Sequence, residues 1–162
     1  MEQQFNSLFE SPLGLIEIKA TDKAVTHISF VENETAPAYS NNICLEAEGQ
    51  LRAYFAGEQK MFDFPFVQNG TPFQQQVWRL LYQIPYGKTI SYRDLTKQYG
   101  DVKTIPAVAA AKGRNNLAIV VPCHRVIGSN ATLTGYAGGL WRKKWLLDHE
   151  AKFHSGVQQL FG

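Results

Sequence analysis

Apolar and polar positions alternate along residues 12–31 in two runs that are separated by a polar turn. Leu13–Ile18 is the first run and Val25–Val31 is the second. A period of two residues is typical of a half-buried β-strand, so this segment predicts a β-hairpin. A shorter aromatic strand is indicated over Met61–Val67, where Pro65 favours a position at the edge or the end of a sheet.

Helical spacing of apolar positions is the other regular pattern in the chain. Thr71 and Ser91 are good N-cap residues, and Gly57, Gly100 and Gly113 each follow a stretch of helical spacing. These signals predict helices over 43–56, 72–84, 91–99, 105–112 and 141–149, the last of which ends at Glu150. A β-branched run over Leu117–Val121 predicts a buried strand that leads directly into Pro-Cys-His-Arg.

The turn-rich segment VQNGTP at 67–72 predicts a domain boundary, which divides the chain into 1–69 and 70–162. The first part carries four basic and ten acidic residues, a balance of −6, and the second carries twelve and four, a balance of +8. In this basic part the helices over 91–99 and 105–112 resemble a helix-turn-helix. The pattern indicates a polyanionic partner, although a solvated charged face and ordinary helix packing would produce it equally.

Composition narrows the class of protein further. The chain has 162 residues of which 44% are hydrophobic, which suits one domain or two small ones. No apolar stretch is long enough for a bilayer and the first residues lack the features of a signal peptide, so we expect a cytoplasmic protein. Cys44 and Cys123 are the two cysteines. We expect no disulfide between them, and no metal site, because the histidines and cysteines lack zinc spacing.

The chemistry of interest lies at Cys123, which is followed by His124. A thiol at neutral pH is only a few per cent thiolate, and a neighbouring imidazole can accept its proton. Glu150, on the last predicted helix, is a candidate to orient that imidazole. The alternative, that Cys123 is a buried apolar filler and Glu150 a solvated helix end, stays open on these residues alone.

Several motifs identify a family by resemblance. PFQQQVW, IPYGKTISY, RNN, IVVPCHRV, GYAGGL and KKWLLDHE occur in this order between Pro72 and Glu150, and together they resemble the O6-alkylguanine-DNA alkyltransferases. The resemblance implies an α+β fold with a small N-terminal RNase-H-like α/β domain and a C-terminal winged-helix-like domain that binds DNA. It also implies single-turnover DNA repair without a cofactor, on double-stranded DNA containing O6-alkylguanine, by a protein that we expect to be a monomer.

The resemblance assigns the catalytic roles. Cys123 accepts the alkyl group from O6 of guanine as a thioether, so each molecule acts once. His124 takes the thiol proton through a water molecule, and Glu150 orients His124. Asn115 matches the family's hinge asparagine, which ties the helix-turn-helix to the active-site strand.

The resemblance also assigns residues that bind the extruded base and the DNA. Tyr136 forms a hydrogen bond with the base and helps to neutralise O6, and Lys143 lies near the same group. The carbonyl groups of Cys123 and Val126 accept hydrogen bonds from the exocyclic amine. Tyr92 presses on the DNA backbone to turn the nucleotide out. Three basic residues are predicted to bind DNA: Lys112, Arg114 and Arg125.

Three positions depart from the family pattern. Pro106 occupies the place of the arginine that fills the gap left by the flipped base, Asn116 replaces a proline, and Ala137 replaces a serine. Arg114 or Lys112 is a candidate substitute for the missing arginine. Two other functions remain alternatives: a sensor of alkylated DNA that does not repair it, although such relatives carry tryptophan at the nucleophile position, and a cysteine hydrolase with a Cys-His-Glu triad.

Overall fold

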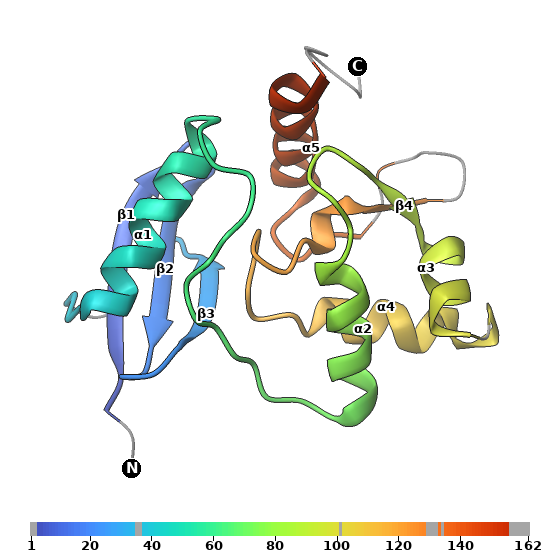
Figure 1. Cartoon of the computed structure of the whole chain (residues 1–162), viewed down its shortest axis with the longest axis horizontal. Helices are drawn as coiled ribbons and strands as arrows, with labels where there is room; N and C mark the ends of the chain where they lie inside the picture. Colours follow the sequence, from blue (N-terminus) through green and yellow to red (C-terminus); the bar gives the residue numbers. More distant parts are fainter. Residues whose placement is uncertain (1–2, 35–36, 101, 129–132, 134, 156–162) are drawn as a thin grey trace. The chain divides into compact units, whose positions relative to one another are not determined.

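A computed structural model describes residues 3–34, 37–100, 102–128, 133 and 135–155. The chain forms two compact units (Figure 1). The first comprises Met1–Gln68 together with Asn116–Ala118, and the second comprises Asn69–Asn115 together with Ile119–Gly162. In the part of the chain that is described, no helix combines the length and the apolar character needed to cross a membrane.

The first unit is an antiparallel sheet covered by a helix. Strands β1 (Phe5–Ser11), β2 (Gly14–Ala20) and β3 (Val25–Phe30) pair in the order β1-β2-β3, and α1 (Asn42–Phe55) packs on them. The predicted hairpin is therefore confirmed as β2 and β3, and the first predicted helix as α1. Alternating strand positions and the inner face of α1 supply the core: Phe9, Ile16, Ile18, Val25, Ile28, Leu51 and Tyr54.

Two features of this unit differ from the sequence-based expectation. Strand β1 was not anticipated, because its sequence FNSLFES is rich in polar residues and contains no β-branched ones. The predicted strand over Met61–Val67 was wrong in extent, since only an isolated bridge joins Phe66 to Val25. Pro65 has no N–H to donate to a ladder, and the aromatic rings of this segment pack edge to face instead.

The second unit is built from helices around a very short parallel strand pair. Its elements are α2 (Pro72–Tyr82), β4 (Ile90–Ser91), α3 (Tyr92–Tyr99), the 3-10 helix η1 (Val102–Thr104), α4 (Ile105–Gly113), the 3-10 helix η2 (Cys123–Arg125), β5 (Val126–Ile127) and α5 (Leu140–Ser155). Helices α3 and α4 pack on each other and on α2, as Figure 1 shows, and form the expected helix-turn-helix. Trp78 Nε1 on α2 donates to the carbonyl of Ala111 on α4 at 2.9 Å.

Local capping explains where these helices begin and end. Thr71 and Gln74 form a reciprocal capping box at the start of α2, and Ser91 Oγ accepts from Asp94 N at the start of α3. Gly100, with φ of +133°, ends α3. The last predicted helix was too short, because α5 continues beyond Glu150 to Ser155. No glycine or proline occurs between Glu150 and Ser155, so the helix propagates over these residues.

The predicted strand over Leu117–Val121 is wrong. Leu117 makes one bridge to Ile28 of β3 within the first unit, and the chain then turns. Ile119 adopts φ of +73°, an uncommon conformation for a β-branched residue. All of 119–121 is buried, so the apolar run records burial and not an extended backbone.

Candidate active site

Cys123 lies at the start of η2, directly after the strained turn at Ile119. Its backbone N–H donates to the carbonyl of Val121 at 2.8 Å, and the residue is 8% exposed. Asn115 Nδ2 donates to the same carbonyl at 2.9 Å and approaches Cys123 Sγ at 3.5 Å. Asn115 therefore fixes both the turn and the thiol, and backbone strain of the kind seen at Ile119 is typical of functional sites.

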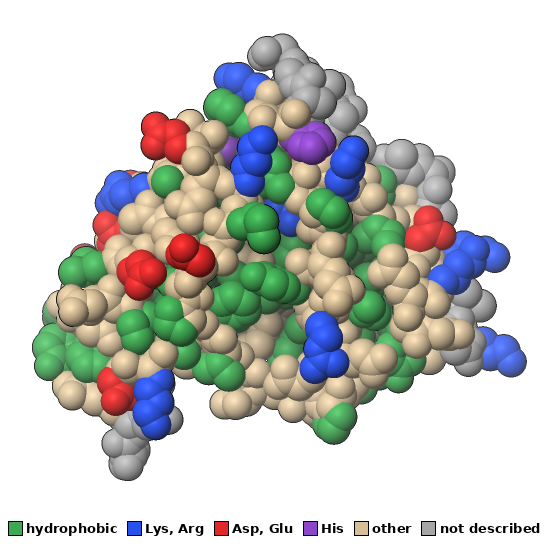
Figure 2. All heavy atoms as spheres, in the orientation of Figure 1, with side chains coloured by type: hydrophobic (Ala, Val, Ile, Leu, Met, Phe, Trp, Pro, Cys, Tyr) green, Lys and Arg blue, Asp and Glu red, His purple; other side chains and the backbone are tan. Residues whose placement is uncertain are grey.

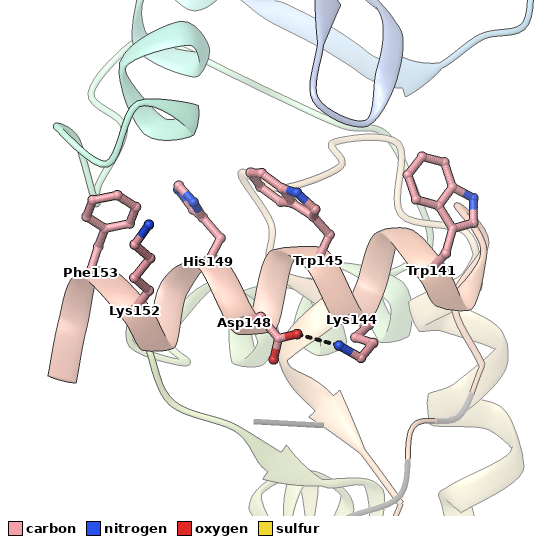
Figure 3. Close-up of a pocket in the computed structure, with 7 residues that line it drawn as sticks. All are labelled: Trp141, Lys144, Trp145, Asp148, His149, Lys152 and Phe153. Atoms are coloured by element: carbon pink, nitrogen blue, oxygen red, sulfur yellow. Dashed lines mark hydrogen bonds and ion pairs between the residues drawn. The ribbon is translucent and has the colours of Figure 1, made fainter. Parts of the chain in front are cut away.

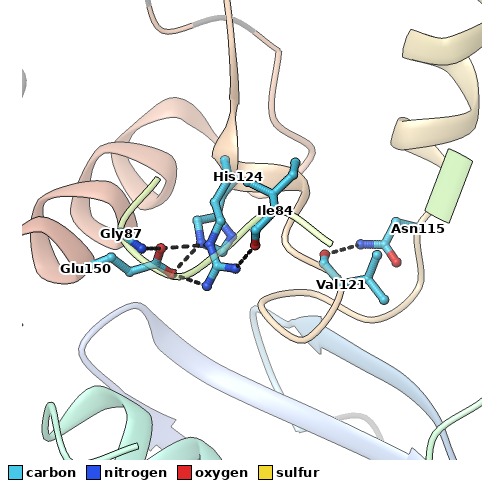
Figure 4. Close-up of polar contacts among 7 residues, drawn as sticks. Ile84, Gly87, Asn115, Val121, His124 and Glu150 are labelled. Carbon is cyan, nitrogen blue, oxygen red and sulfur yellow. Dashed lines mark hydrogen bonds and ion pairs between the residues drawn. The ribbon is translucent and has the colours of Figure 1, made fainter. Parts of the chain in front are cut away.

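His124 is completely buried and bound to a carboxylate that is itself fully bonded (Figure 4). His124 Nε2 lies 2.7 Å from Glu150 Oε2. Arg125 donates to both oxygens of Glu150, from Nε to Oε1 at 2.8 Å and from Nη2 to Oε2 at 3.0 Å. Gly87 N donates to Oε1 at 3.2 Å, so the carboxylate accepts at least four hydrogen bonds from the described residues. Four is about the number of lone-pair sites that an ionised carboxylate offers.

This network selects the tautomer of His124. An ionised carboxylate only accepts hydrogen bonds, so Nε2 carries the proton and Nδ1 keeps its lone pair. Nδ1 is buried, and no described residue gives it a hydrogen-bond partner. Burial lowers the pKa of His124 against the opposing effect of Glu150, so the neutral ring is favoured. Burial alone would raise the pKa of Glu150, but His124 and Arg125 hold that pKa well below its usual range.

Tyr136 and Lys143 belong to the surroundings of the thiol. Burial, followed by the nearness of Cys123, raises the pKa of Tyr136 well above its ordinary value, so the hydroxyl keeps its proton. That hydroxyl is buried and has no hydrogen-bond partner among the described residues. Lys143 Nζ donates to the carbonyl of Val126, and burial together with Lys112 lowers the pKa of Lys143 to about 8.

The structure separates the basic residues that were predicted to bind DNA. Arg114 is exposed just beyond α4. Arg125 is 6% exposed and is engaged by Glu150 and by the carbonyl of Ile84, which its Nη1 reaches at 2.7 Å. That placement contradicts a phosphate contact for Arg125, because its donors serve the buried network. Lys112 is also buried, and its Nζ donates to the carbonyl of Gly135 at 2.6 Å.

The remaining predicted residues lie on the helix-turn-helix or next to it. Tyr92 is half-buried at the start of α3, with the Lys112 ammonium 5.4 Å from its ring centroid. Pro106 is exposed in the first turn of α4, and Ala137 and Asn116 are exposed as well. Residues 129–132 and 134, which precede Tyr136 in the sequence, lie outside the described residues. Within the described ranges, no group of three or more His, Cys, Asp or Glu side chains is placed to hold a metal ion.

Sequence reasoning missed the turn that completes the network. Residues 84–87 follow α2 and supply the Ile84 carbonyl to Arg125 and the Gly87 N–H to Glu150. Gly87 has φ of +78°, and a Cβ there would stand 2.5 Å from His154 Cγ. The motif PYGK marks a turn in the sequence, but its backbone contacts to residues about forty and sixty positions away are set only by the tertiary fold.

A helix-turn-helix unit that carries a buried thiol, next in sequence to a histidine that is hydrogen-bonded to a carboxylate, is typical of a class of DNA-directed proteins with a cysteine nucleophile. Within that class, the chain belongs to the 6-O-methylguanine DNA methyltransferase family. The family's ribonuclease-like domain matches residues 5–68, and its DNA binding domain matches residues 72–152. These matches confirm the expected fold class and the family that the motifs resembled.

Individual relatives match over most of their length. The methylated-DNA--protein-cysteine methyltransferase of Methanosarcina acetivorans is 43% identical over 152 residues, which are 90% of this chain and 97% of that protein. The constitutive protein of that name from Bacillus subtilis is 44% identical over 139 residues, 80% of this chain and 84% of its own. The crystal structure of Mycobacterium tuberculosis OGT in complex with DNA superimposes with a TM-score of 0.82 at 40% identity, covering 90% of this chain and 92% of that one.

Proposed function

We propose that this protein repairs DNA by transferring a methyl group from O6 of guanine to Sγ of Cys123. The observation that carries the proposal is the pairing of a buried thiol, bonded by Asn115, with a neighbouring histidine whose Nδ1 has no hydrogen-bond partner among the described residues. The names of the relatives state methyl transfer between DNA and a protein cysteine, and one related structure contains DNA.

The first step generates the nucleophile. His124 Nδ1 accepts the Cys123 thiol proton through a water molecule, and the imidazolium that forms is stabilised by Glu150 across the 2.7 Å bond from Nε2. Arg125 keeps Glu150 ionised and oriented. The carboxylate can therefore stabilise the positive charge that forms on His124 without any rearrangement of the two side chains. His124 can act as the general base because burial favours its neutral state.

The second step transfers the alkyl group. The Cys123 thiolate attacks the methyl carbon, the S–C bond forms, and the C–O6 bond breaks with its electron pair passing to the guanine. The Tyr136 hydroxyl donates to O6 and Lys143 lies near the same group, so the departing base is neutralised. The proton that left the thiol finally resides on guanine, which balances the charge. The product thioether cannot be displaced readily, so one molecule transfers one group.

The remaining residues present the base to the thiol. A guanine inside a duplex cannot reach a buried cysteine, so it must leave the stack. Tyr92, at the start of α3, presses on the DNA backbone, and Arg114 binds a phosphate. The carbonyl of Val126 accepts from Lys143 in the structure and has a second lone pair for the exocyclic amine of the base.

Intact-protein mass spectrometry tests the proposal directly. After incubation with duplex DNA containing O6-methylguanine, the protein should gain the mass of one methyl group, and peptide mapping should place it on Cys123. Cys123→Ala should gain nothing and still bind the duplex, and Cys44→Ala should react like the unchanged protein.

Three outcomes would contradict the proposal in distinguishable ways. Methylation of Cys44 would show that Cys123 is not the acceptor. Repeated turnover would indicate hydrolytic chemistry at the same thiol. Tight binding of the lesion without any gain in mass would indicate a sensor of alkylated DNA that does not repair it.

A further inference from the structure

Lys112 is a buried lysine on the second helix of the helix-turn-helix. It is 5% exposed, and its Nζ donates to the carbonyl of Gly135 at 2.6 Å. A buried ammonium group is costly unless hydrogen bonds and charges compensate it. The residue is therefore not placed as a solvated phosphate contact, which is the role that its position in the basic part of the chain suggested.

The hydrogen bond from Lys112 to Gly135 lies where α3, α4 and the segment before Tyr136 come together. Gly135 directly precedes Tyr136, and a Cβ on Gly135 would lie 3.3 Å from the hydroxyl oxygen of Tyr92. The Lys112 ammonium also stands 5.4 Å from the centre of the Tyr92 ring. Helix α3, helix α4 and the segment that carries Tyr136 thus meet at a single side chain.

Lys112 also influences the charge of the site. Its positive charge contributes, after burial, to the lowered pKa of Lys143, which stands at about 8. Tyr136, with its hydroxyl buried near Cys123, lies next to the residue that Lys112 holds. A displacement of Gly135 would therefore move the hydroxyl that is to bond O6 relative to the thiol.

We propose that Lys112 is a positioning residue that holds the Gly135–Tyr136 segment against α4 and thereby sets the geometry of the alkyl-transfer site. The inference rests on the proposed function, because it concerns the placement of Tyr136 for transfer to Cys123. It assigns Lys112 to the chemical step and not to affinity for the DNA backbone.

The test compares a free-base substrate with a DNA substrate. Single-turnover alkylation is measured by intact mass with O6-benzylguanine and with O6-methylguanine duplex, for the unchanged protein, Lys112→Met, Lys112→Arg and Lys97→Met. Lys97 is an exposed lysine on α3 and controls for loss of one positive charge. Affinity for undamaged duplex is measured over a range of salt concentrations, and melting temperatures report folding.

We expect Lys112→Met to react about tenfold more slowly with both substrates, because a charge-assisted hydrogen bond is lost. Its affinity for undamaged duplex and the salt dependence of that affinity should stay unchanged. Lys112→Arg should recover much of the rate, because a guanidinium can still donate to the Gly135 carbonyl. Lys97→Met should react with O6-benzylguanine at the unchanged rate.

Other results would overturn the inference. A normal rate with O6-benzylguanine, together with weaker duplex binding and a salt slope smaller by about one, would make Lys112 a phosphate contact. Slow reaction of both variants with a large drop in melting temperature would make it a purely structural residue. If neither substrate transfers its alkyl group to the unchanged protein, the proposed function itself fails. This outcome is separate from the behaviour of the variants.

Discussion

At the residue scale, the proposed mechanism makes the reactivity of this site depend on the charge state of one imidazole. His124 has Glu150 against Nε2, and Arg125 and Lys143 are the other charged groups that act on it. Glu150 raises the pKa of His124, whereas burial, Arg125 and Lys143 lower it. The neutral ring is the form that accepts a proton, so the residues that lower the pKa extend the reaction to more acidic solution.

The pH dependence of transfer follows from that balance. The rate should fall only when the pH drops below the ordinary histidine pKa of about 6.5, because the pKa of His124 is lowered. Arg125→Gln removes a charge that lowers it, so the acidic limb of the rate profile should move to higher pH. Single-turnover rates measured from about pH 5 to pH 8 check this prediction. An acidic limb that stays in place would show that Arg125 does not act on His124.

Arg125→Gln should also destabilise the protein. Removing Arg125 leaves the buried charge on Glu150 with the hydrogen bonds of His124 and Gly87 but without its cationic partner, and breaking a buried ion pair costs about 3–5 kcal/mol in the free energy of unfolding. Denaturant unfolding measures this loss. Arg125→Lys, which keeps a positive charge, should lose less stability and should shift the acidic limb less.

At the element scale, one face of α5 contributes side chains to the active site, and another face carries a row of aromatic rings. Lys143 and Glu150 are buried toward the active site. Figure 3 shows the rings of Trp141, Trp145, His149 and Phe153 on one side of the helix. Trp145 stacks on His149 at 4.7 Å between ring centroids. The contact between the rings of His149 and Phe153 stabilises the turn of α5 that follows Glu150. Glu150 therefore lies within the helix and not at its frayed end.

The turn between α2 and β4 is the second element on which the site depends. Gly87→Ala places a side chain at φ of +78° within 2.5 Å of His154 and disturbs the N–H that bonds Glu150. We expect a loss of stability on the order of 1–3 kcal/mol and slower transfer. Gly100→Ala is the matched control, because φ is +133° there but no atom lies within 4 Å. It should lose stability without losing its rate, as unfolding and single-turnover measurements would show.

Pro106 is exposed in the first turn of α4, at the place where the resemblance to the family implies an arginine. An arginine at this place would fill the gap in the stack, and proline supplies neither charge nor reach. Unstacking costs a few kcal/mol in a duplex and least in a single strand. Pro106→Arg should therefore accelerate transfer from duplex DNA selectively. Equal acceleration with single-stranded DNA and with the free base, or none with duplex, would show that another side chain already fills the gap.

At the scale of the whole molecule, charge is divided between the two parts of the sequence. Residues 70–162 have a balance of +8 and residues 1–69 a balance of −6. On the face drawn in Figure 2, the coloured lysine and arginine side chains are spread out and do not form one patch. Burial of Lys112, Arg125 and Lys143 removes three of the positive charges from direct phosphate contact.

Binding of undamaged duplex should therefore be strongly dependent on salt, but less steeply than the full charge of residues 70–162 suggests. Each phosphate contact contributes about 0.9 to the slope of log affinity against log salt. Arg114→Met should reduce this slope by about one, because Arg114 is exposed. Fluorescence anisotropy at several salt concentrations measures the slope. An affinity that does not change with salt would contradict a phosphate-binding surface.

The sequence by itself determined the local elements and the chemical groups. Alternation predicted β2 and β3, and capping residues such as Thr71 and Ser91 predicted the starts of helices, because these signals act over a few residues. The motif around Cys123 likewise identified the family, and it indicated the candidate nucleophile and its neighbouring histidine. These are properties of short segments, for which neighbours in sequence are also neighbours in space.

Only the tertiary structure decided which groups meet. The apolar run at Leu117–Val121 was compatible with a strand, and it is a buried turn because burial and not extension is what an apolar run encodes. In the sequence, nothing distinguishes Arg125 and Lys112 from cations at the surface. Their partners, Glu150 and Gly135, lie 25 and 23 positions away. A hydrogen bond depends on the positions of both partners in space, and for distant residues the packing of the whole unit fixes those positions.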